Sequence, residues 1–281
     1  AQDGECVAGS NDGCKASQQC QALGYCTAMD GECIAGSDAD CTESDTCLTE
    51  GFCVAIDGQC VAGTDADCQA AAACASEGQC TAQGGQCIAG SDEDCAPAAV
   101  CQQFGLCTAD QGQCIAKTDD DCAASDTCVN DGYCTAVNGV CGALTDEQCE
   151  QSPGCATDGY CTAQDGKCIA ASNKDCKQSD VCPNDGYCVA QDGQCVAGND
   201  ADCAKTEGCS YDGWCTALDG ACVAGSDADC KQAELCSYYG KCAVSEKVCI
   251  AATDKDCQDA TWCKLFGYCK AENGECVKPS N

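Results

Sequence analysis

The stretch that decides the fold is Cys33–Cys60, CIAGSDADCTESDTCLTEGFCVAIDGQC, which holds five cysteines. Successive cysteines are eight, six, six and seven positions apart, and this spacing recurs along the chain without insertion or deletion. The first cysteine of the pattern returns every 27 residues, at positions 6, 33, 60, 87, 114, 141, 168, 195, 222, 249 and 276. A fixed period of this length indicates a tandem repeat protein rather than one or two globular domains.

The spacing of the 41 cysteines favours disulfides over metal binding. Metal-thiolate sites usually place two ligands two to four residues apart, whereas the closest cysteines here are separated by five residues, and the chain has no histidine. We therefore predict a disulfide framework made in an oxidising compartment. Four cysteines per unit allow three pairings, and the sequence does not choose among them. In the first two units the framework consists of Cys14, Cys20, Cys26, Cys33, Cys41, Cys47, Cys53 and Cys60.

An odd number of cysteines leaves one without an intrachain partner. If the four cysteines that follow each 27-residue mark pair among themselves, the remaining cysteine is Cys6. Otherwise it is Cys276. The odd count also excludes a polymer of identical chains in which every cysteine forms a disulfide.

Each unit carries signals for two short helical turns. Ser37 with Asp40 exemplifies the start signal, a serine, threonine or asparagine with an acid or amide three residues later, which resembles a capping box. The stop signal is a glycine two residues before the fourth cysteine, such as Gly51, because glycine adopts the left-handed conformation that ends helices. Pro153 and Pro183 fall between these signals, so we predict a break between two helical turns.

The second half of each unit predicts a β-hairpin. Short apolar stretches flank Asp57-Gly58 and Asn138-Gly139, dipeptides that suit a two-residue hairpin turn. The expected fold is a small disulfide-rich tandem repeat: ten 27-residue units of helical turns plus a hairpin, stacked as an elongated solenoid or rod. We place an N-terminal half-hairpin at residues 1–9, the ten repeats at 10–279 and a C-terminal tail at 280–281.

Charge and composition argue against several classes of function. The net charge of −33 excludes nucleic acid and anionic membrane surfaces as partners, because both require a basic face. No apolar run is long enough for membrane insertion. Without histidine or arginine, neither a Ser-His nor a Cys-His arrangement nor an arginine anion clamp can form, so we predict no enzyme and no cofactor.

Calcium is the exception that the acidic residues leave open. Two loops contain three aspartates each together with spare carbonyl groups, and calcium takes six to eight oxygen ligands. These candidate calcium ligands are Asp192, Asp200, Asp202, Asp219, Asp227 and Asp229. The alternative is that the same carboxylates cap helices and keep the protein solvated.

Two further rows of side chains repeat along the chain. An aromatic residue precedes the fourth cysteine at Tyr25, Phe52, Tyr133, Tyr160, Tyr187, Trp214 and Tyr268. Such a row can bind a glycan, but its interruptions favour packing between stacked units. A threonine follows the fourth cysteine in six units, and we interpret it as an ordinary strand residue rather than an ice-binding face.

The pattern C-x7-C-x5-C-x3-G-[YF]-C-x6-C resembles the tandem cysteine-rich repeats of extracellular proteins, including bacterial surface proteins described as EGF-like, although the C-x-C of a true EGF module is absent. The resemblance spans the whole chain and implies a secreted or surface-attached structural role. We expect an extracellular structural protein of the cell surface, a filament subunit or rigid stalk built by end-to-end self-assembly. The alternative is a multivalent binding module for calcium or a glycan.

Overall fold

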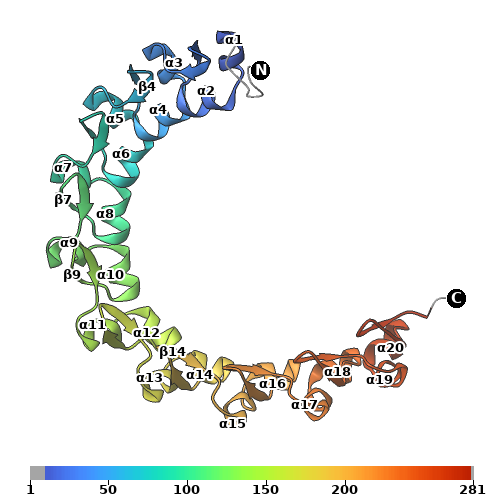
Figure 1. Cartoon of the computed structure of the whole chain (residues 1–281). Coiled ribbons are helices and arrows are strands. Elements are labelled where there is room, and N and C mark those ends of the chain that lie inside the picture. The colour runs from blue at the N-terminus through green and yellow to red at the C-terminus, as the bar shows by residue number, and fades with distance from the viewer. Residues whose placement is uncertain (1–9, 280–281) are drawn as a thin grey trace. The chain divides into compact units, whose positions relative to one another are not determined.

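The computed structural model describes residues 10–279 as ten repeats, each with two short helices followed by a two-stranded antiparallel hairpin (Figure 1). The prediction of ten units with a helical part and a hairpin is therefore confirmed. The half-hairpin that we placed at residues 1–9 and the tail at 280–281 lie outside the described residues.

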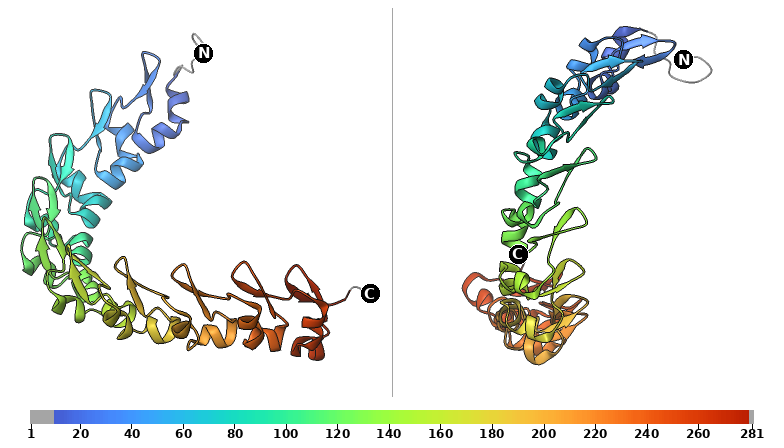
Figure 2. Two further views of the ribbon diagram at one scale, coloured as in Figure 1. Left: turned by 60° about the horizontal axis from the view of Figure 1, so that its bottom comes forward. Right: turned by 90° about the vertical axis from the view of Figure 1, so that its left-hand side faces the viewer.

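The chain divides into two compact units. Among the described residues, the first comprises residues 10–129 and Tyr133–Gly142, and the second comprises Asn130–Gly132 and residues 143–279. Within each unit the second helices of neighbouring repeats contact one another, for example α4 (Asp45–Glu50) with α6 (Ala72–Glu77) in the first (Figure 1). Figure 2 shows that the hairpins of each unit project from the same side of successive repeats.

The helices are four to six residues long. The first helices of the repeats are α1 (Asn11–Lys15), α3 (Asp38–Thr42), α5 (Asp65–Ala70), α7 (Asp92–Cys95), α9 (Asp119–Ala123), α11 (Asp146–Glu150), α13 (Asn173–Lys177), α15 (Asp200–Cys203), α17 (Asp227–Gln232) and α19 (Asp254–Asp259). The second helices are α2 (Gln18–Leu23), α4, α6, α8 (Ala99–Phe104), α10 (Asp126–Asp131), α12 (Pro153–Asp158), α14 (Val181–Asp185), α16 (Glu207–Asp212), α18 (Glu234–Tyr239) and α20 (Thr261–Phe266).

Local hydrogen bonds explain where these helices begin and end. Ser226 and Asp229 form a capping box at the start of α17, because each side chain accepts a hydrogen bond from the other residue's backbone N–H. The predicted break is made by a buried hydroxyl: Ser44 donates to the carbonyl of Cys41 at 2.7 Å and accepts from the N–H of Cys47 at 3.2 Å. One side chain thus ends α3 and starts α4. Gly51 ends α4 with φ of 78°.

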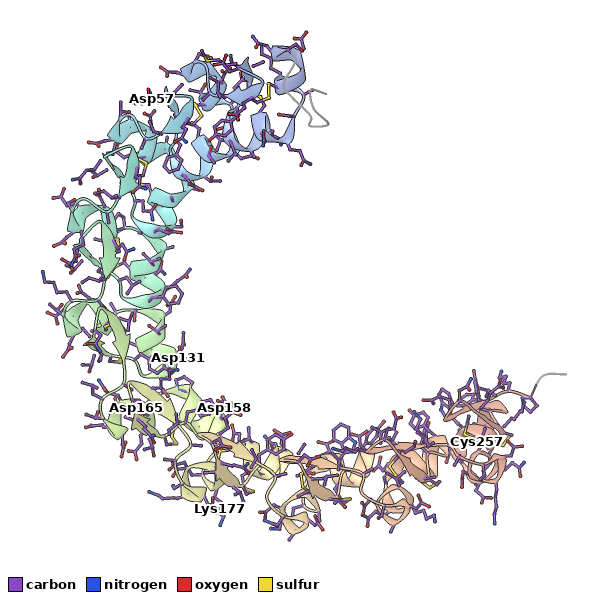
Figure 3. All side chains as sticks on the ribbon, viewed as in Figure 1. Asp57, Asp131, Asp158, Asp165, Lys177 and Cys257 are labelled. Carbon is purple, nitrogen blue, oxygen red and sulfur yellow. A yellow bond between two sulfur atoms is a disulfide. The ribbon has the colours of Figure 1, made fainter. Side chains whose placement is uncertain are left out.

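Each hairpin has strands of three residues joined by a two-residue turn. In the first, Thr27 pairs with Ile34, and the turn residues Asp30 and Gly31 have φ of 53° and 88°. Positive φ at both positions is the requirement of the tight hairpin turn that the sequence predicted. Figure 3 labels Asp57 and Asp165, which stand at two such turns.

The hairpins are β1 (Thr27–Met29) with β2 (Glu32–Ile34), β3 (Val54–Ile56) with β4 (Gln59–Val61), β5 (Thr81–Gln83) with β6 (Gln86–Ile88), β7 (Thr108–Asp110) with β8 (Gln113–Ile115), β9 (Thr135–Val137) with β10 (Val140–Gly142), β11 (Thr162–Gln164) with β12 (Lys167–Ile169), β13 (Val189–Gln191) with β14 (Gln194–Val196), β15 (Thr216–Leu218) with β16 (Ala221–Val223), β17 (Ala243–Ser245) with β18 (Val248–Ile250), and β19 (Lys270–Glu272) with β20 (Glu275–Val277).

Two nested disulfides hold each repeat together. The outer bridge joins the first helix to the second strand across 19 positions, and the inner bridge joins the second helix to the residue before the hairpin across six positions. In the first two repeats the bridges are Cys14–Cys33, Cys20–Cys26, Cys41–Cys60 and Cys47–Cys53. This is one of the three pairings that the sequence left open.

Cys276 was one of our two candidates for the unpaired cysteine, and this prediction is wrong. It bonds to Cys257, because the bridging set is the four cysteines that follow each 27-residue mark. Twenty bridges use all the cysteines from Cys14 to Cys276. The other candidate, Cys6, lies outside the described residues.

Cystines and alanines take the place of a conventional apolar core. Cys68 is fully buried, and it forms one cluster with Ala62 and with its bonded partner Cys87. Phe52 of the preceding repeat packs against this cluster. The predicted packing role of the aromatic row is therefore seen at this position, where a ring covers the disulfide of the next repeat.

Candidate functional site

The surface that recurs throughout the chain is the junction, by which we mean the contact between one repeat and the next. Its tightest point is the glycine that ends the second helix. At Gly105, with φ of 70°, an added Cβ would lie 2.5 Å from Sγ of Cys141 and 2.8 Å from the carbonyl oxygen of Asp121. Both atoms belong to the next repeat, so glycine is required for its backbone conformation and for the close approach.

A backbone hydrogen bond joins the hairpins at every junction. The residue after the second strand donates its N–H to the hairpin turn of the next repeat, as Ala89 does to the carbonyl of Gly112 at 3.0 Å. The other donors are Ala35, Ala62, Ala116, Ala143, Ala170, Ala197, Ala224 and Ala251. Eight of the nine acceptors are turn glycines, and the ninth is Lys247, whose φ is 68°.

The threonine row belongs to the junction. The hydroxyl of Thr108 donates to the carboxylate of Asp121 in the next repeat at 3.1 Å. The same carboxylate accepts from the N–H of Lys117 at 2.8 Å and of Thr118 at 2.9 Å. Equivalent threonine to aspartate bonds are Thr27 to Asp40, Thr81 to Asp94, Thr162 to Asp175 and Thr216 to Asp229. Our interpretation of the threonines as ordinary strand residues missed this role.

The hydrogen bonds at this junction shift the pKa of Asp121. Burial alone would raise its pKa, but hydrogen bonds from Thr118, Lys117 and Thr108 hold the pKa below the ordinary value of 3.8. A lowered pKa means that the folded state favours the ionised carboxylate. The stabilisation is therefore complete above pH 3.8 and is lost as the pH falls through the lower pKa of the folded state.

We expect Asp121→Ala to weaken the junction by about 3 kcal/mol, because it removes several charge-assisted hydrogen bonds, and Thr108→Val to weaken it by about 1 kcal/mol. Hydrogen exchange of the Ala116 N–H, which bonds to Gly139 at this junction, measures both effects. The difference between wild type and Asp121→Ala should shrink as the pH is lowered from about 5 to about 2. Val54 occupies the position of Thr108 in another repeat, so the valine variant should fold. Equal exchange rates in both variants at neutral pH would contradict the role of Asp121.

A second side-chain oxygen in each repeat, from an aspartate in eight repeats and an asparagine in two, holds the hairpin onto its own first helix. The first residue of that helix accepts a hydrogen bond from the N–H of the central residue of the first strand, for example Asp92 from Ala109 at 2.8 Å. That N–H points away from the partner strand, so the bond satisfies an edge group. The acceptors are Asn11, Asp38, Asp65, Asp92, Asp119, Asp146, Asn173, Asp200, Asp227 and Asp254.

The six candidate calcium ligands divide among these structural roles. Asp200 and Asp227 hold hairpins, at 2.8 and 2.9 Å from the N–H groups of Ala217 and Val244. Asp202 bonds Asn199 and Lys205, which hold its pKa below the ordinary value, and Asp229 caps α17. Asp192 and Asp219 stand at hairpin turns, and Asp219 lies 2.7 Å from Nζ of Lys247.

Calcium binding stays a prediction. Between residues 10 and 279, no three or more acidic or cysteine side chains are grouped so that they could hold a metal ion. A calcium titration of the dispersed protein, read by its melting temperature, tests the prediction directly.

The aromatic side chains contain a feature that the sequence reasoning missed. Rings gather on the second helices of the last repeats, where Trp262 lies 5.1 Å from Tyr239, 5.8 Å from Phe266 and 5.0 Å from Tyr268 between ring centroids. The charge interaction with Tyr239, followed by hydrogen bonding to the same residue, raises the pKa of Tyr211 above its ordinary value. The available signal was compositional, since seven of the chain's 13 aromatic residues fall between positions 211 and 268.

Comparison with known proteins gives no relative: no protein-family model, no curated protein and no solved structure matches the chain. None of the helices between residues 10 and 279 has the length and apolar character needed to cross a bilayer. The function must therefore be argued from the junction and the other features of this chain.

Proposed function

We propose that the chain is an extracellular structural protein whose repeats stack into an elongated solenoid and whose end faces join copies end to end into a filament or rigid stalk. The observation that carries this proposal is the junction, which joins neighbouring repeats in the same way nine times between residues 10 and 279. In the nine repeats before the last, the glycine equivalent to Gly267 is buried, and a Cβ there would lie 2.5 to 2.8 Å from an atom of the next repeat. Gly267 has the same φ, 79°, but it is exposed, and no described atom lies within 4 Å of the corresponding point.

This end face has the geometry that the chain uses nine times to receive a repeat. Leu265 and Phe266 are exposed beside Gly267. In a second copy of this chain, the first helix and hairpin of the first described repeat, α1 with β1 and β2, are surfaces of the required kind, since those of the later repeats already contact the repeat before them. A contact that uses two different faces does not close on itself, so its repetition produces a filament.

The charge distribution supports assembly at this end. Residues 233–281 hold six lysines and seven acidic residues, a net charge of −1, which leaves −32 of the total −33 on residues 1–232. Two strongly acidic surfaces would repel each other, whereas a nearly neutral end approaches an acidic one at little electrostatic cost.

The disulfides support an extracellular location. The chain has twenty disulfides between Cys14 and Cys276. Structural disulfides form and persist in oxidising compartments, and small units without a large apolar core commonly depend on them for stability. A cell-surface location and a mechanical role agree with ten near-equivalent repeats.

Gly267→Ala is expected to abolish end-to-end assembly while leaving every repeat folded. The new methyl group would collide with an incoming repeat, as it would at the internal junctions, but it meets nothing in the isolated chain. Sedimentation velocity and negative-stain microscopy at high protein concentration measure the loss.

The matched control is Gly84→Ala. Gly84 also has positive φ, 61°, and open space at its Cβ position, but it lies at the hairpin turn of an internal repeat. This variant should assemble like wild type. The proposal fails if the Gly267 variant polymerises normally or if wild type stays monomeric under all concentrations tested.

A further inference from the structure

The two residues that precede the glycine of the second helix differ from repeat to repeat. In α10, α12 and α14 these residues are polar: Asn130 and Asp131, Thr157 and Asp158, and Asn184 and Asp185. In α16, α18 and α20 they are Tyr211 and Asp212, Tyr238 and Tyr239, and Leu265 and Phe266. Figure 3 labels Asp131 and Asp158 of the polar set. Among the earlier repeats, α2 has Ala22 and Leu23 and α8 has Gln103 and Phe104 at these positions. An aromatic residue is therefore rare here before α16, whereas α16, α18 and α20 each carry at least one.

A cavity of about 540 Å³ lies where the change begins, between α14 and α16. Rings of Tyr187, Tyr211 and Trp214 line it together with three acidic residues. These are Asp185, Glu207 and Asp212. No lysine is among the lining residues, so the charge of the cavity is negative.

The sequence explains why the cavity forms at this junction. Pro183 has no N–H, whereas the equivalent Ser210 in α16 donates to the carbonyl of Thr206. Helix α14 accordingly starts one residue before its cysteine, Cys182, whereas α16 starts two residues before Cys209. The N–H of Asp180, just before α14, donates instead to the carbonyl of Ala156 in α12 at 2.8 Å. The missing N–H leaves α14 one residue shorter than α16, and its residues Pro183, Asn184 and Asp185 line the cavity.

Gly208 completes the cavity on the side of α16. A Cβ at Gly208 would lie 3.1 Å from Cε3 of Trp214, so the absence of a side chain lets the indole lie against the helix. The indole still keeps 42% of its accessible surface, as does Tyr211. Two aromatic faces are thus available to a molecule that enters the cavity.

The acidic side chains of the cavity have no competing partner. Among residues 10–279, no hydrogen bond or ion pair engages the carboxylates of Asp185, Glu207 or Asp212, unlike the capping carboxylates of the junctions. Burial raises the pKa of Asp212 above its ordinary value, since a partly buried carboxylate lacks some of its hydration. A cation beside it would replace that hydration.

We propose that this cavity binds an alkylammonium cation. Aromatic faces attract cations through the quadrupole of the ring, the carboxylates supply opposite charge, and the rings bury the methyl or methylene groups next to nitrogen. Anions are disfavoured by the same carboxylates. The ammonium group has two potential sources, a free amine or the side chain of a lysine in another polypeptide.

Choline is the probe for the free cation, and Trp214 is the reporter. In a Trp262→Phe background Trp214 is the only tryptophan, so its fluorescence reports the cavity alone. We expect choline to quench the fluorescence of Trp214 saturably, with a dissociation constant of about 1 mM. This weak affinity is what a few exposed cation–π and charge contacts provide. Dimethylbutanol, in which carbon replaces the ammonium nitrogen of choline, should bind about tenfold more weakly. Calorimetry on wild type repeats the measurement without the substitution.

Glu207→Gln and Asp212→Asn should each weaken choline binding by about threefold, because each removes one carboxylate near the cation. The matched control is Asp158→Asn, because Asp158 in α12 occupies the position of Asp212 in a repeat that does not line the cavity. This variant should leave choline binding unchanged. A short acetylated peptide with one lysine, compared with the same peptide bearing acetyl-lysine, distinguishes the second source from the first.

Three results would overturn the proposal. They are no saturation up to about 50 mM choline in wild type, equal affinity for choline and dimethylbutanol, and full binding by the double variant Glu207→Gln/Asp212→Asn. Saturation by an uncharged oligosaccharide without any response to choline would likewise reject the cation and assign the rings to a glycan.

Discussion

Complete reduction of the protein is expected to abolish the helices and hairpins of every repeat. The chain-entropy model assigns about 3 kcal/mol to an outer bridge that closes a loop of about 20 residues, and about 2 kcal/mol to an inner bridge that closes a loop of about seven. In a repeat whose core consists of cystines and alanines, no other interaction contributes as much to the free energy of folding. The outer-bridge cysteine Cys41 is itself fully buried. Circular dichroism before and after treatment with a phosphine reductant measures the loss.

Selective removal of one bridge is the control for general effects of the reductant. Cys47→Ala/Cys53→Ala removes an inner bridge and should leave the repeat folded but less stable. Cys41→Ala/Cys60→Ala removes the outer bridge of the same repeat and should unfold it locally, because it also deletes a fully buried sulfur. A reduced protein that keeps its helical signal at room temperature would show that packing alone specifies the repeat.

Local structure was the part of the fold that the sequence could predict. Capping boxes and hairpin turns act over two to four residues, so signals such as Thr118 with Asp121 and Asp57 with Gly58 can be recognised in a short stretch of sequence. The disulfide pairing could not be predicted, because four cysteines joined by short chain segments are compatible with three connectivities. The pairing depends on the break between the two helices at Ser44, which separates the helix of Cys41 from the helix of Cys47.

The junction was hidden for a different reason. Gly105, Thr108 and Asp121 each have a sufficient local explanation, as a helix stop, a strand residue and a helix cap. Each also contacts the neighbouring repeat, 13 residues away for Thr108 and Asp121 and 36 residues away for Gly105 and Cys141. A single side chain that performs a local and a non-local role shows only the first in the sequence.

The aromatic cavity was missed because the repeats were compared for what they share. Pro183 has no proline counterpart in another repeat, and Tyr211 has a tyrosine counterpart only at Tyr238. In an array whose structure is carried by the shared positions, departures are the residues most free to acquire a separate function.

Gly240→Ala is expected to separate the last repeat from the one before it, whereas Gly267→Ala should not disturb the fold. Both glycines have nearly the same φ, 76° and 79°, so both variants share a cost of about 1 kcal/mol for a left-handed alanine. Only at Gly240 would the new Cβ lie 2.8 Å from the carbonyl oxygen of Asp256 and 2.9 Å from Cα of Cys257. Backbone atoms tied to a buried disulfide cannot rotate away, and overpacking of this kind costs about 3 kcal/mol.

The readout for the Gly240 variant is hydrogen exchange at the Ala251 N–H, which donates to the carbonyl of Gly274 across this junction at 2.8 Å. A loss of about 3 kcal/mol predicts exchange about 100-fold faster in Gly240→Ala, with wild-type exchange at Ala35, which lies in the other compact unit. Gly267→Ala is the matched control, because it carries the same substitution one repeat later with no neighbour to meet. Its Ala251 N–H should exchange as in wild type. If both variants accelerate exchange equally, the cost arises from the backbone conformation alone. The close approach of neighbouring repeats would then not be the reason for glycine at this position.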